Sequence, residues 1–230
     1  MELEVQGHGA LLRVSWADAR ARAGGVCAAD RTVSSLPVAL VALLAAPTVG
    51  PVVTEPKTGV TFATTRGDMS LLGVGLRTKT FLKFKVYAIG LYVADSALDG
   101  PLAVYKGKVG TPAFYRELIA GDFEKQFVLK LVRDLSAEQI QGSFRSHMPS
   151  ADEKLLDQFV SYFPRTKAGQ ECVLHWVPGG SLHTTVGGVA KPSIADKAFA
   201  DQVFAIWLRD RPTEDPIRRQ VVSRASALLE

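Results

Sequence analysis

The sequence predicts an α+β fold, in which helices pack against one antiparallel sheet. Most of the β-type patterns come before the helical ones, neighbouring strands are joined by hairpin turns, and strands and helices do not alternate regularly. The 230 residues are 47% hydrophobic and 22% charged, which is typical of a soluble globular protein with enough apolar material for a sizeable core.

Residues 1–51 differ in composition from the rest of the chain. They are rich in Ala, Val, Gly and Arg, and they contain the apolar run Ser35–Pro47. That run is short for a membrane span and includes Pro37, but it has the length of a signal-peptide core or of the end of an organelle-targeting segment. Four acidic residues in this part count against a transit peptide. A targeting segment and a simple N-terminal extension both remain open, and we expect the folded domain to span residues 52–230.

The first β-type patterns of this domain are a short hairpin and a long strand region. Val52–Ala63 contains the turn sequence Glu55–Gly59 between two short β-prone segments, which predicts a hairpin at a sheet edge. Leu71–Asp95 holds a Gly-x-Gly sequence, one arginine and then a long β-type run. From Phe84 onward one face of that run is apolar throughout, and the other is charged at first and apolar later. This pattern predicts a strand that begins at solvent and continues into a layer buried on both sides.

Later in the chain, capping residues and apolar stripes predict helices. Thr111 caps a helix that has Pro112 in its first turn and ends at Gly121. Capping sequences at Ser136, Ser150 and Ser193 predict three more, and residues 213–229 give a last amphipathic helix. Further strands are predicted within Asp122–Arg133 and in a hairpin, Glu171–Gly187, whose turn is Pro178–Gly180.

Several classes of function are disfavoured by the sequence. The net charge of +4 comes from scattered basic residues, so we expect no nucleic-acid partner. Cys27 and Cys172 form no CxxC motif, and the four histidines are dispersed, so we expect neither a disulfide framework nor a metal site, and no cofactor. Gly73 and Gly75 lack the third glycine of a dinucleotide fingerprint and are better explained by a tight turn or a close backbone approach. The motifs therefore indicate a binding domain without visible catalytic machinery.

Arg77 is the candidate for recognition of an acidic ligand. A surface arginine at the start of a strand is one interpretation of this residue. In the other, its planar guanidinium binds a carboxylate through two hydrogen bonds. Tyr87 follows ten residues later, and ten extended residues span roughly 33 Å. The two side chains can therefore meet only if Thr78–Lys85 folds back, which the sequence alone leaves undecided.

Five segments occur in the order found in the chalcone isomerase superfamily, which the chain resembles from about Val53 to Glu230. They are Leu71–Arg77, Lys85–Asp95, Gly121–Ile140, His175–Val186 and Ser193–Leu208. The resemblance implies an open-faced β-sandwich, with a large antiparallel sheet covered by helices and a ligand cleft between them. The family holds isomerases, which close a chalcone to a flavanone, and plastid fatty-acid-binding proteins without known catalysis.

The resemblance also suggests which branch this chain is nearer to. The arginine that steers the isomerase substrate corresponds to Arg77, and the strand position of the isomerase threonine corresponds to Tyr87. The isomerase's tyrosine, lysine and asparagine fall on Ile140, Ser143 and His147, and all three differ. Isoleucine has no hydroxyl to hold a water, and serine cannot stabilise a phenolate as lysine does.

The resemblance therefore implies a non-catalytic protein that binds free fatty acids. Arg77 and Tyr87 would bind the carboxylate. The remaining ligand-binding candidates are Ile140, Ser143, Phe144, His147, Ser193 and Ile194. Phe84 or Ile89 would contribute from the long strand, whose inward face is undecided.

Two other functions stay open: weak chalcone–flavanone isomerase activity, which is an intramolecular lyase reaction, and a ligand-free role as helper of another enzyme. We expect a plastid location, or otherwise a cytoplasmic one. No stable insertion into a membrane is expected, and the sequence identifies no protein partner.

Overall fold

The computed structural model describes residues 50–79, 84–210 and 215–230. The N-terminal extension expected at 1–51 lies outside these residues except for its last two positions. Its targeting role and its boundary with the domain therefore stay predictions.

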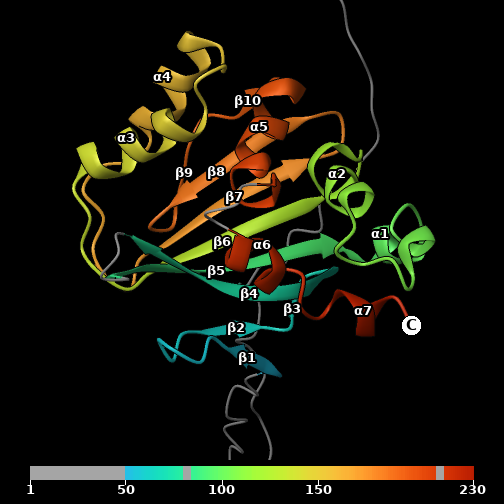
Figure 1. The fold of residues 1–230 in the computed structure, drawn as a ribbon. Coiled ribbons are helices and arrows are strands. Elements are labelled where there is room, and N and C mark those ends of the chain that lie inside the picture. Colours follow the sequence, from blue (N-terminus) through green and yellow to red (C-terminus); the bar gives the residue numbers. More distant parts are fainter. Residues whose placement is uncertain (1–49, 80–83, 211–214) are drawn as a thin grey trace, which may run out of the picture. The chain divides into compact units, whose positions relative to one another are not determined.

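The described chain folds into an antiparallel sheet with helices on one face, which confirms the predicted α+β class (Figure 1). In the described part, the large sheet has the strand order β10-β8-β7-β6-β5-β4-β3, with β9 paired to β8. These strands are β3 (Thr65–Arg66), β4 (Met69–Lys79), β5 (Phe84–Ala94), β6 (Lys125–Leu131), β7 (Glu171–Val177), β8 (Ser181–Val186), β9 (Val189–Ala190) and β10 (Ile194–Ala195). The hairpin predicted at a sheet edge instead forms a separate two-stranded sheet of β1 (Val52–Thr54) and β2 (Thr61–Ala63), because Phe62 packs against β5.

The helices predicted from Thr111 onward are present in the predicted order, with changes at their ends, and two short helical elements before them were not predicted. They are α1 (Asp95–Asp99), the 3-10 turn η1 (Ala103–Tyr105), α2 (Pro112–Ala120), α3 (Ala137–His147), α4 (Glu153–Ser161), α5 (Lys197–Leu208), α6 (Asp215–Gln220) and α7 (Ala225–Leu228). Thr111 caps α2, and Ser136 forms the predicted capping box with Gln139. None of the helices in the described ranges is long and apolar enough to cross a membrane.

Two predicted caps are wrong because an aspartate nearer the helix supplies the acceptor. Asp152 rather than Ser150 caps α4, where its Oδ1 accepts the Leu155 N–H at 3.0 Å. Asp196 rather than Ser193 caps α5, where its Oδ1 accepts the Phe199 N–H at 2.7 Å. A carboxylate is a stronger acceptor than a hydroxyl. The residues just before Asp196 are also extended, because they pair with β8 as β10.

The predicted last helix is broken into α6 and α7. The Arg224 N–H donates to the Leu72 carbonyl at 2.7 Å, and the Arg224 guanidinium donates to the Leu71 carbonyl at 2.7 Å. Leu72 lies at a register shift between β4 and β5, where it has no partner on β5. The backbone N–H and the side chain of Arg224 thus both donate to carbonyls of β4. In a continuous helix the Arg224 N–H would donate to a carbonyl of the helix itself, so the helix is interrupted here.

The glycines Gly73 and Gly75 on β4 admit this C-terminal segment. A Cβ on Gly73 would lie 2.5 Å from the Gln220 carbonyl oxygen, and one on Gly75 would lie 3.1 Å from the Ile217 side chain. The prediction of a close backbone approach is therefore confirmed, and it brings α6 down onto β4.

Strand β5 is buried on both faces, as its pattern predicted. Ala88 and Tyr92 pack with Phe62 of β2 in a small cluster on one face. Ile89 and Leu91 belong to the main core, on the face that the helices cover. Phe84 and Lys85 at the start of the strand are exposed. The sheet therefore has one face for the β1–β2 hairpin and one for the helices, and the candidate site lies on the second.

Candidate functional site

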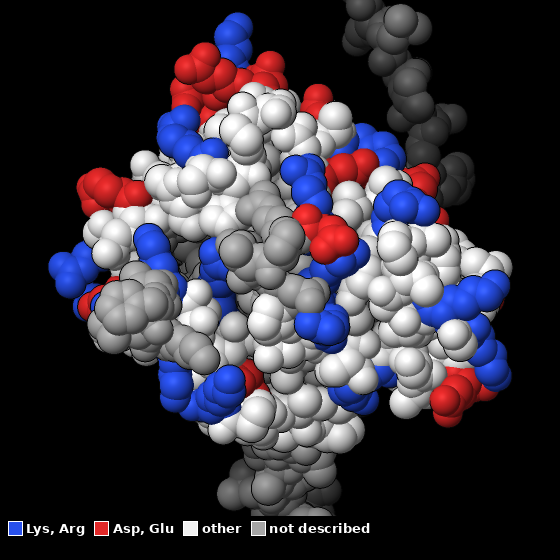
Figure 2. All heavy atoms as spheres, viewed as in Figure 1, with Lys and Arg blue, Asp and Glu red and all other residues white. Residues whose placement is uncertain are grey.

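A cavity of about 550 Å³ lies between the helix face of the sheet and α3. This volume is in the range of roughly 300–1,000 Å³ that small-molecule sites occupy. Figure 2 shows the surface hollowed beside α3, with Lys and Arg side chains at the border of the hollow. The lining comes from β4 to β7, α3, α5 and the segments after β6 and α4. Its members are Arg77, Lys79, Phe84, Val86, Tyr87, Leu129, Leu131, Arg133, Leu135, Glu138, Gln139, Ile140, Gly142, Ser143, Phe144, Ser146, His147, Phe163, Cys172, Leu174, Ile206 and Trp207.

Arg77 and Tyr87 meet in this cavity because β4 and β5 form an antiparallel pair. Arg77 is the register partner of Tyr87, so their side chains project from the same face of the sheet. The chain does fold back between them, which was the condition that the sequence left undecided. Both side chains line the cavity and both are half-buried.

The hydroxyl of Tyr87 is held by α5. Trp207 Nε1–H donates to Tyr87 Oη at 2.8 Å, and Trp207 itself is buried against Phe127 of β6. Because an indole nitrogen only donates, the Tyr87 oxygen is the acceptor in this bond. The contact fixes the position of the hydroxyl beside the cavity.

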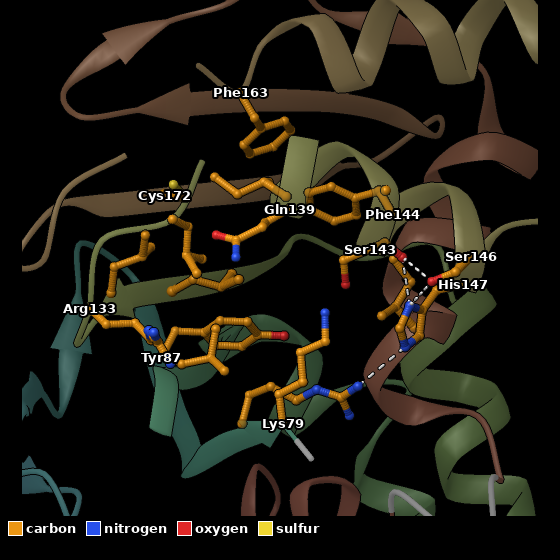
Figure 3. A pocket seen from close by; sticks show the side chains of 18 of the residues that line it. Lys79, Tyr87, Arg133, Gln139, Ser143, Phe144, Ser146, His147, Phe163 and Cys172 are labelled. Atoms are coloured by element: carbon orange, nitrogen blue, oxygen red, sulfur yellow. Dashed lines mark hydrogen bonds between the residues drawn. The ribbon is translucent and has the colours of Figure 1, made fainter. Parts of the chain in front are cut away.

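Arg77 is oriented by His147 of α3. Arg77 Nη2 lies 3.4 Å from His147 Nε2, and His147 Nδ1 lies 2.6 Å from the carbonyl oxygen of Ser143 (Figure 3). A guanidinium only donates and a carbonyl only accepts. Both contacts are satisfied as hydrogen bonds when Nδ1 carries the proton, so that Nδ1–H donates to Ser143 and Nε2 accepts from Arg77. The last turn of α3 thus holds one edge of the guanidinium.

The inner part of the cavity wall is apolar. Its floor consists of Leu129, Phe144, Phe163, Leu174 and Ile206. Phe144 and Phe163 also stack against each other, with ring centres 4.9 Å apart. Cys172 lies in the same wall, where burial raises the pKa of its thiol to about 11, so the sulfur is uncharged and behaves as an apolar group.

The charges around the cavity are unbalanced. Among the described lining residues Arg77, Lys79 and Arg133 are cationic, and Glu138 is the one acid. A hydrogen bond with Ser136 lowers the pKa of the Glu138 carboxyl. An apolar cavity with this excess of positive charge suits an amphiphilic anion.

Six of the eight predicted ligand-binding residues line the cavity. They are Arg77, Tyr87, Ile140, Ser143, Phe144 and His147. Ser193 and Ile194 do not: Ile194 is buried in the core as part of β10, and Ser193 is exposed beside it. This follows from the shifted start of α5, which puts Ser193 outside the helix. Of the two strand candidates, Phe84 lines the cavity, whereas Ile89 packs into the core.

Most of the lining residues were not predicted as part of the site, and three of them carry polar contacts or charge: Lys79, Arg133 and Trp207. Lys79 and Arg133 stand at strand ends, where a charged residue usually means only a solvated surface. Trp207 is part of the apolar stripe of α5 and gives the same pattern as an ordinary core residue. Its hydrogen bond to Tyr87 depends on how α5 crosses the sheet. No local signal in the sequence marks these roles.

The fold and the cavity define a class of protein: an antiparallel sheet covered by helices, with a largely apolar cavity that has basic residues in its lining between the two layers. The chain belongs to the chalcone isomerase-like family, whose model matches residues 55–222. The fold inferred from the five segments is thereby confirmed.

Individual relatives agree with this assignment. The chain is 26% identical over 201 residues to a chalcone–flavanone isomerase of Phaseolus vulgaris, covering 77% of this chain and 89% of the relative. It is 37% identical over 73 residues to Altered inheritance of mitochondria protein 18 of Debaryomyces hansenii, covering 29% of this chain and 25% of that protein. The crystal structure of a fatty-acid binding protein of Arabidopsis thaliana matches with a TM-score of 0.68 at 22% identity, covering 78% and 99% of the two chains.

Proposed function

We propose that this protein binds free fatty acids and does not catalyse a reaction on them. The observation that carries the proposal is the pairing of Arg77 with Tyr87 at one end of an apolar cavity. A carboxylate between them would accept hydrogen bonds from the guanidinium and from the phenol, and the alkyl chain would run toward Phe144 and Leu174. The match to the Arabidopsis fatty-acid binding protein supports this reading.

Simple energetics favour such a ligand. Burial of each methylene contributes about 0.8 kcal/mol, so a medium or long chain offsets the cost of ordering it. Hydrogen bonds from a charged donor are worth roughly 1.5–3 kcal/mol and would fix the polar end. At the isomerase positions on α3, the side chains that face the cavity are Ile140, Ser143 and His147. None of these is the tyrosine, lysine or asparagine that the resemblance associates with isomerisation.

Calorimetry with delipidated protein and palmitate tests the proposal. We expect binding by the wild type and a loss of affinity of roughly 10- to 100-fold in Arg77→Ala. Arg116→Ala is the matched control, because Arg116 is an exposed arginine of α2 outside the cavity. Absence of binding by the wild type, or equal affinities of the two variants, would contradict the proposal.

Chalcone isomerisation is the second candidate, favoured by the match over 89% of the Phaseolus enzyme. Loss of chalcone absorbance in the presence of purified protein decides this point. A rate well above the spontaneous one would show that the chain is an enzyme after all. Mass spectrometry of lipid that co-purifies with the protein separates a carrier from a ligand-free helper.

A plastid location is part of the same proposal, and it rests on the family resemblance and on the composition of residues 1–51. The partial matches to proteins named as mitochondrial favour the mitochondrion as the competing location. A fluorescent fusion of residues 1–55 distinguishes the two compartments, and a cytosolic signal would exclude both.

A further inference from the structure

The rim of the cavity carries two cations and an aromatic side chain that the proposed carboxylate site does not require. Lys79 ends β4, Arg133 follows β6, and both are exposed. Phe84 is the register partner of Lys79 and leaves 49% of its surface exposed. The Arg133 guanidinium lies 5.7 Å from the centre of the Phe84 ring. The three residues therefore form one cationic–aromatic group, which we call the rim.

The rim charges are not neutralised by the described part of the chain. Neither Lys79 nor Arg133 forms an ion pair with an acid among the described residues, and Glu138 is the one acid that shares the cavity lining with them. The ion pairs near this end of the sheet join other residues, namely Lys130 with Glu171 and Arg165 with Asp134. The rim is thus a local excess of positive charge around an exposed aromatic ring.

We propose that the rim docks the protein on the surface of a bilayer that contains anionic lipids. Lys79 and Arg133 would contact lipid phosphates, and Phe84 would insert at the boundary between headgroups and acyl chains. Juxtaposed basic and aromatic residues are the combination that binds such an interface, where charge attraction and apolar burial act together.

The membrane fits the rim better than an acidic protein does. To bury the half-exposed Phe84, a partner protein would need an apolar pocket of matching shape beside its acidic residues. A bilayer needs no such match, because its acyl chains lie directly beneath the anionic headgroups. Docking would also bring the cavity mouth against the bilayer. If the proposed function holds, a fatty acid would then pass between bilayer and cavity without exposing its chain to water. Docking itself does not depend on that function.

Flotation of the full chain with vesicles tests the docking, without added fatty acid. Vesicles of phosphatidylcholine with about one third phosphatidylglycerol are compared with pure phosphatidylcholine at low and at 0.5 M salt. We expect binding to the anionic vesicles only, and its loss at high salt because screening shortens the reach of the charges to a few ångströms. Lys79→Glu with Arg133→Glu is expected to lower the partition coefficient at least about tenfold, and Phe84→Glu about fivefold.

Two control variants separate the rim from general charge and general hydrophobicity. Lys108→Glu with Arg116→Glu makes the same change of net charge near α2, outside the cavity lining. Val104→Glu removes another exposed apolar side chain, which has 67% of its surface exposed. Both controls are expected to bind vesicles as the wild type does.

Equal losses in rim and control variants would overturn the proposal, since attraction would then come from the overall charge. No flotation of the wild type would also overturn it, in favour of an acidic protein as the partner. Calorimetry with palmitate keeps the two proposals apart. Protein that binds palmitate but not vesicles disproves docking alone, and protein that binds vesicles but not palmitate disproves the fatty-acid function alone.

Discussion

Arg77 and Lys125 are two cations on the helix face of the same sheet, and the fold treats them in opposite ways. Tyr87, the partner of Arg77, pairs with Leu131, whereas Lys125 pairs with Val93, so the cations mark opposite ends of β5 and β6. Arg77 faces a cavity. Lys125 is fully buried, and its Nζ donates to the carbonyls of Ile119 at 3.0 Å and Gly121 at 2.7 Å.

The surroundings of Lys125 show that its role is structural. Its ammonium lies over the Trp176 ring, 4.1 Å from the centre, and it closes the C-terminal end of α2 by binding the last carbonyls. Burial lowers the pKa of Lys125 to about 7. A buried and perturbed amine is thus explained by helix capping, and it is the less buried Arg77 that faces space for a ligand. Burial alone therefore does not mark a cation as a candidate for ligand binding. What distinguishes Arg77 from Lys125 is the cavity beside its side chain.

The largest expected effect is on the pH dependence of stability at the Lys125 end. The folded protein releases the Lys125 proton near pH 7, whereas the unfolded chain keeps it up to about pH 10.5. The unfolded state therefore binds more protons between these values, and the free energy of unfolding should rise from pH 7 to pH 9 by at most about 3 kcal/mol. Urea unfolding at both pH values should show this rise in the wild type and in Lys108→Met. It should be missing in Lys125→Met, and an unchanged slope in that variant would disprove the assignment.

A pair of glycine substitutions compares side-chain packing near Lys125 with side-chain packing beside the cavity. A Cβ on Gly121 would clash with the Phe123 ring and lie 2.6 Å from the Glu117 carbonyl, whereas nothing lies within 4 Å of one on Gly142 in α3. Gly121→Ala should destabilise the protein by about 2 kcal/mol. Gly142→Ala should stabilise it by about 0.5–1 kcal/mol, because alanine is the better helix former. Thermal unfolding measures both, and equal shifts would mean that the two ends are packed alike.

At the cavity end, Tyr87→Phe should affect binding and stability together. Loss of the hydroxyl removes a donor to the carboxylate, and palmitate affinity should fall about fivefold, which is ~1 kcal/mol. The Trp207 N–H also loses its acceptor, so stability should fall by about 1 kcal/mol. Calorimetry and urea unfolding of the same sample measure the two effects. An unchanged affinity would remove Tyr87 from the site.

The smallest expected effect is at His147, which positions Arg77. His147→Leu removes the acceptor at Nε2, and palmitate affinity should fall about threefold. His147→Gln keeps an oxygen that can accept from the guanidinium, so its affinity should stay closer to that of the wild type. If the two variants bind equally, His147 does not orient Arg77.

Local features of this fold could be predicted because they depend on near neighbours in the chain. The cap of α2 at Thr111, the capping box of Ser136 and the turn at Pro178–Gly180 each need only a few consecutive residues. The two wrong caps, Ser150 and Ser193, are also local: in each case an aspartate closer to the helix is the better acceptor.

The site shows the limit of such reasoning. The sequence singled out Arg77 and Tyr87 but left them roughly 33 Å apart along an extended chain. The pairing of β4 with β5 made them neighbours. Ser193 and Ile194 were expected beside them and lie elsewhere, because pairing with β8 keeps that segment extended. Trp207 lies in the site because of the way α5 crosses the sheet, and the hydrophobic periodicity of a helix does not predict that crossing.

The sequence by itself determined the fold class and most of the longer strand and helix segments, because periodicity and capping are properties of consecutive residues. It also singled out Arg77 and Tyr87 as candidates for binding a carboxylate. The tertiary structure alone decided that Arg77 faces a cavity, whereas Lys125 is buried at the C-terminal end of α2. Both are basic residues at strand positions, and their difference arises from strand register and helix packing, which bring together groups that are distant in the chain.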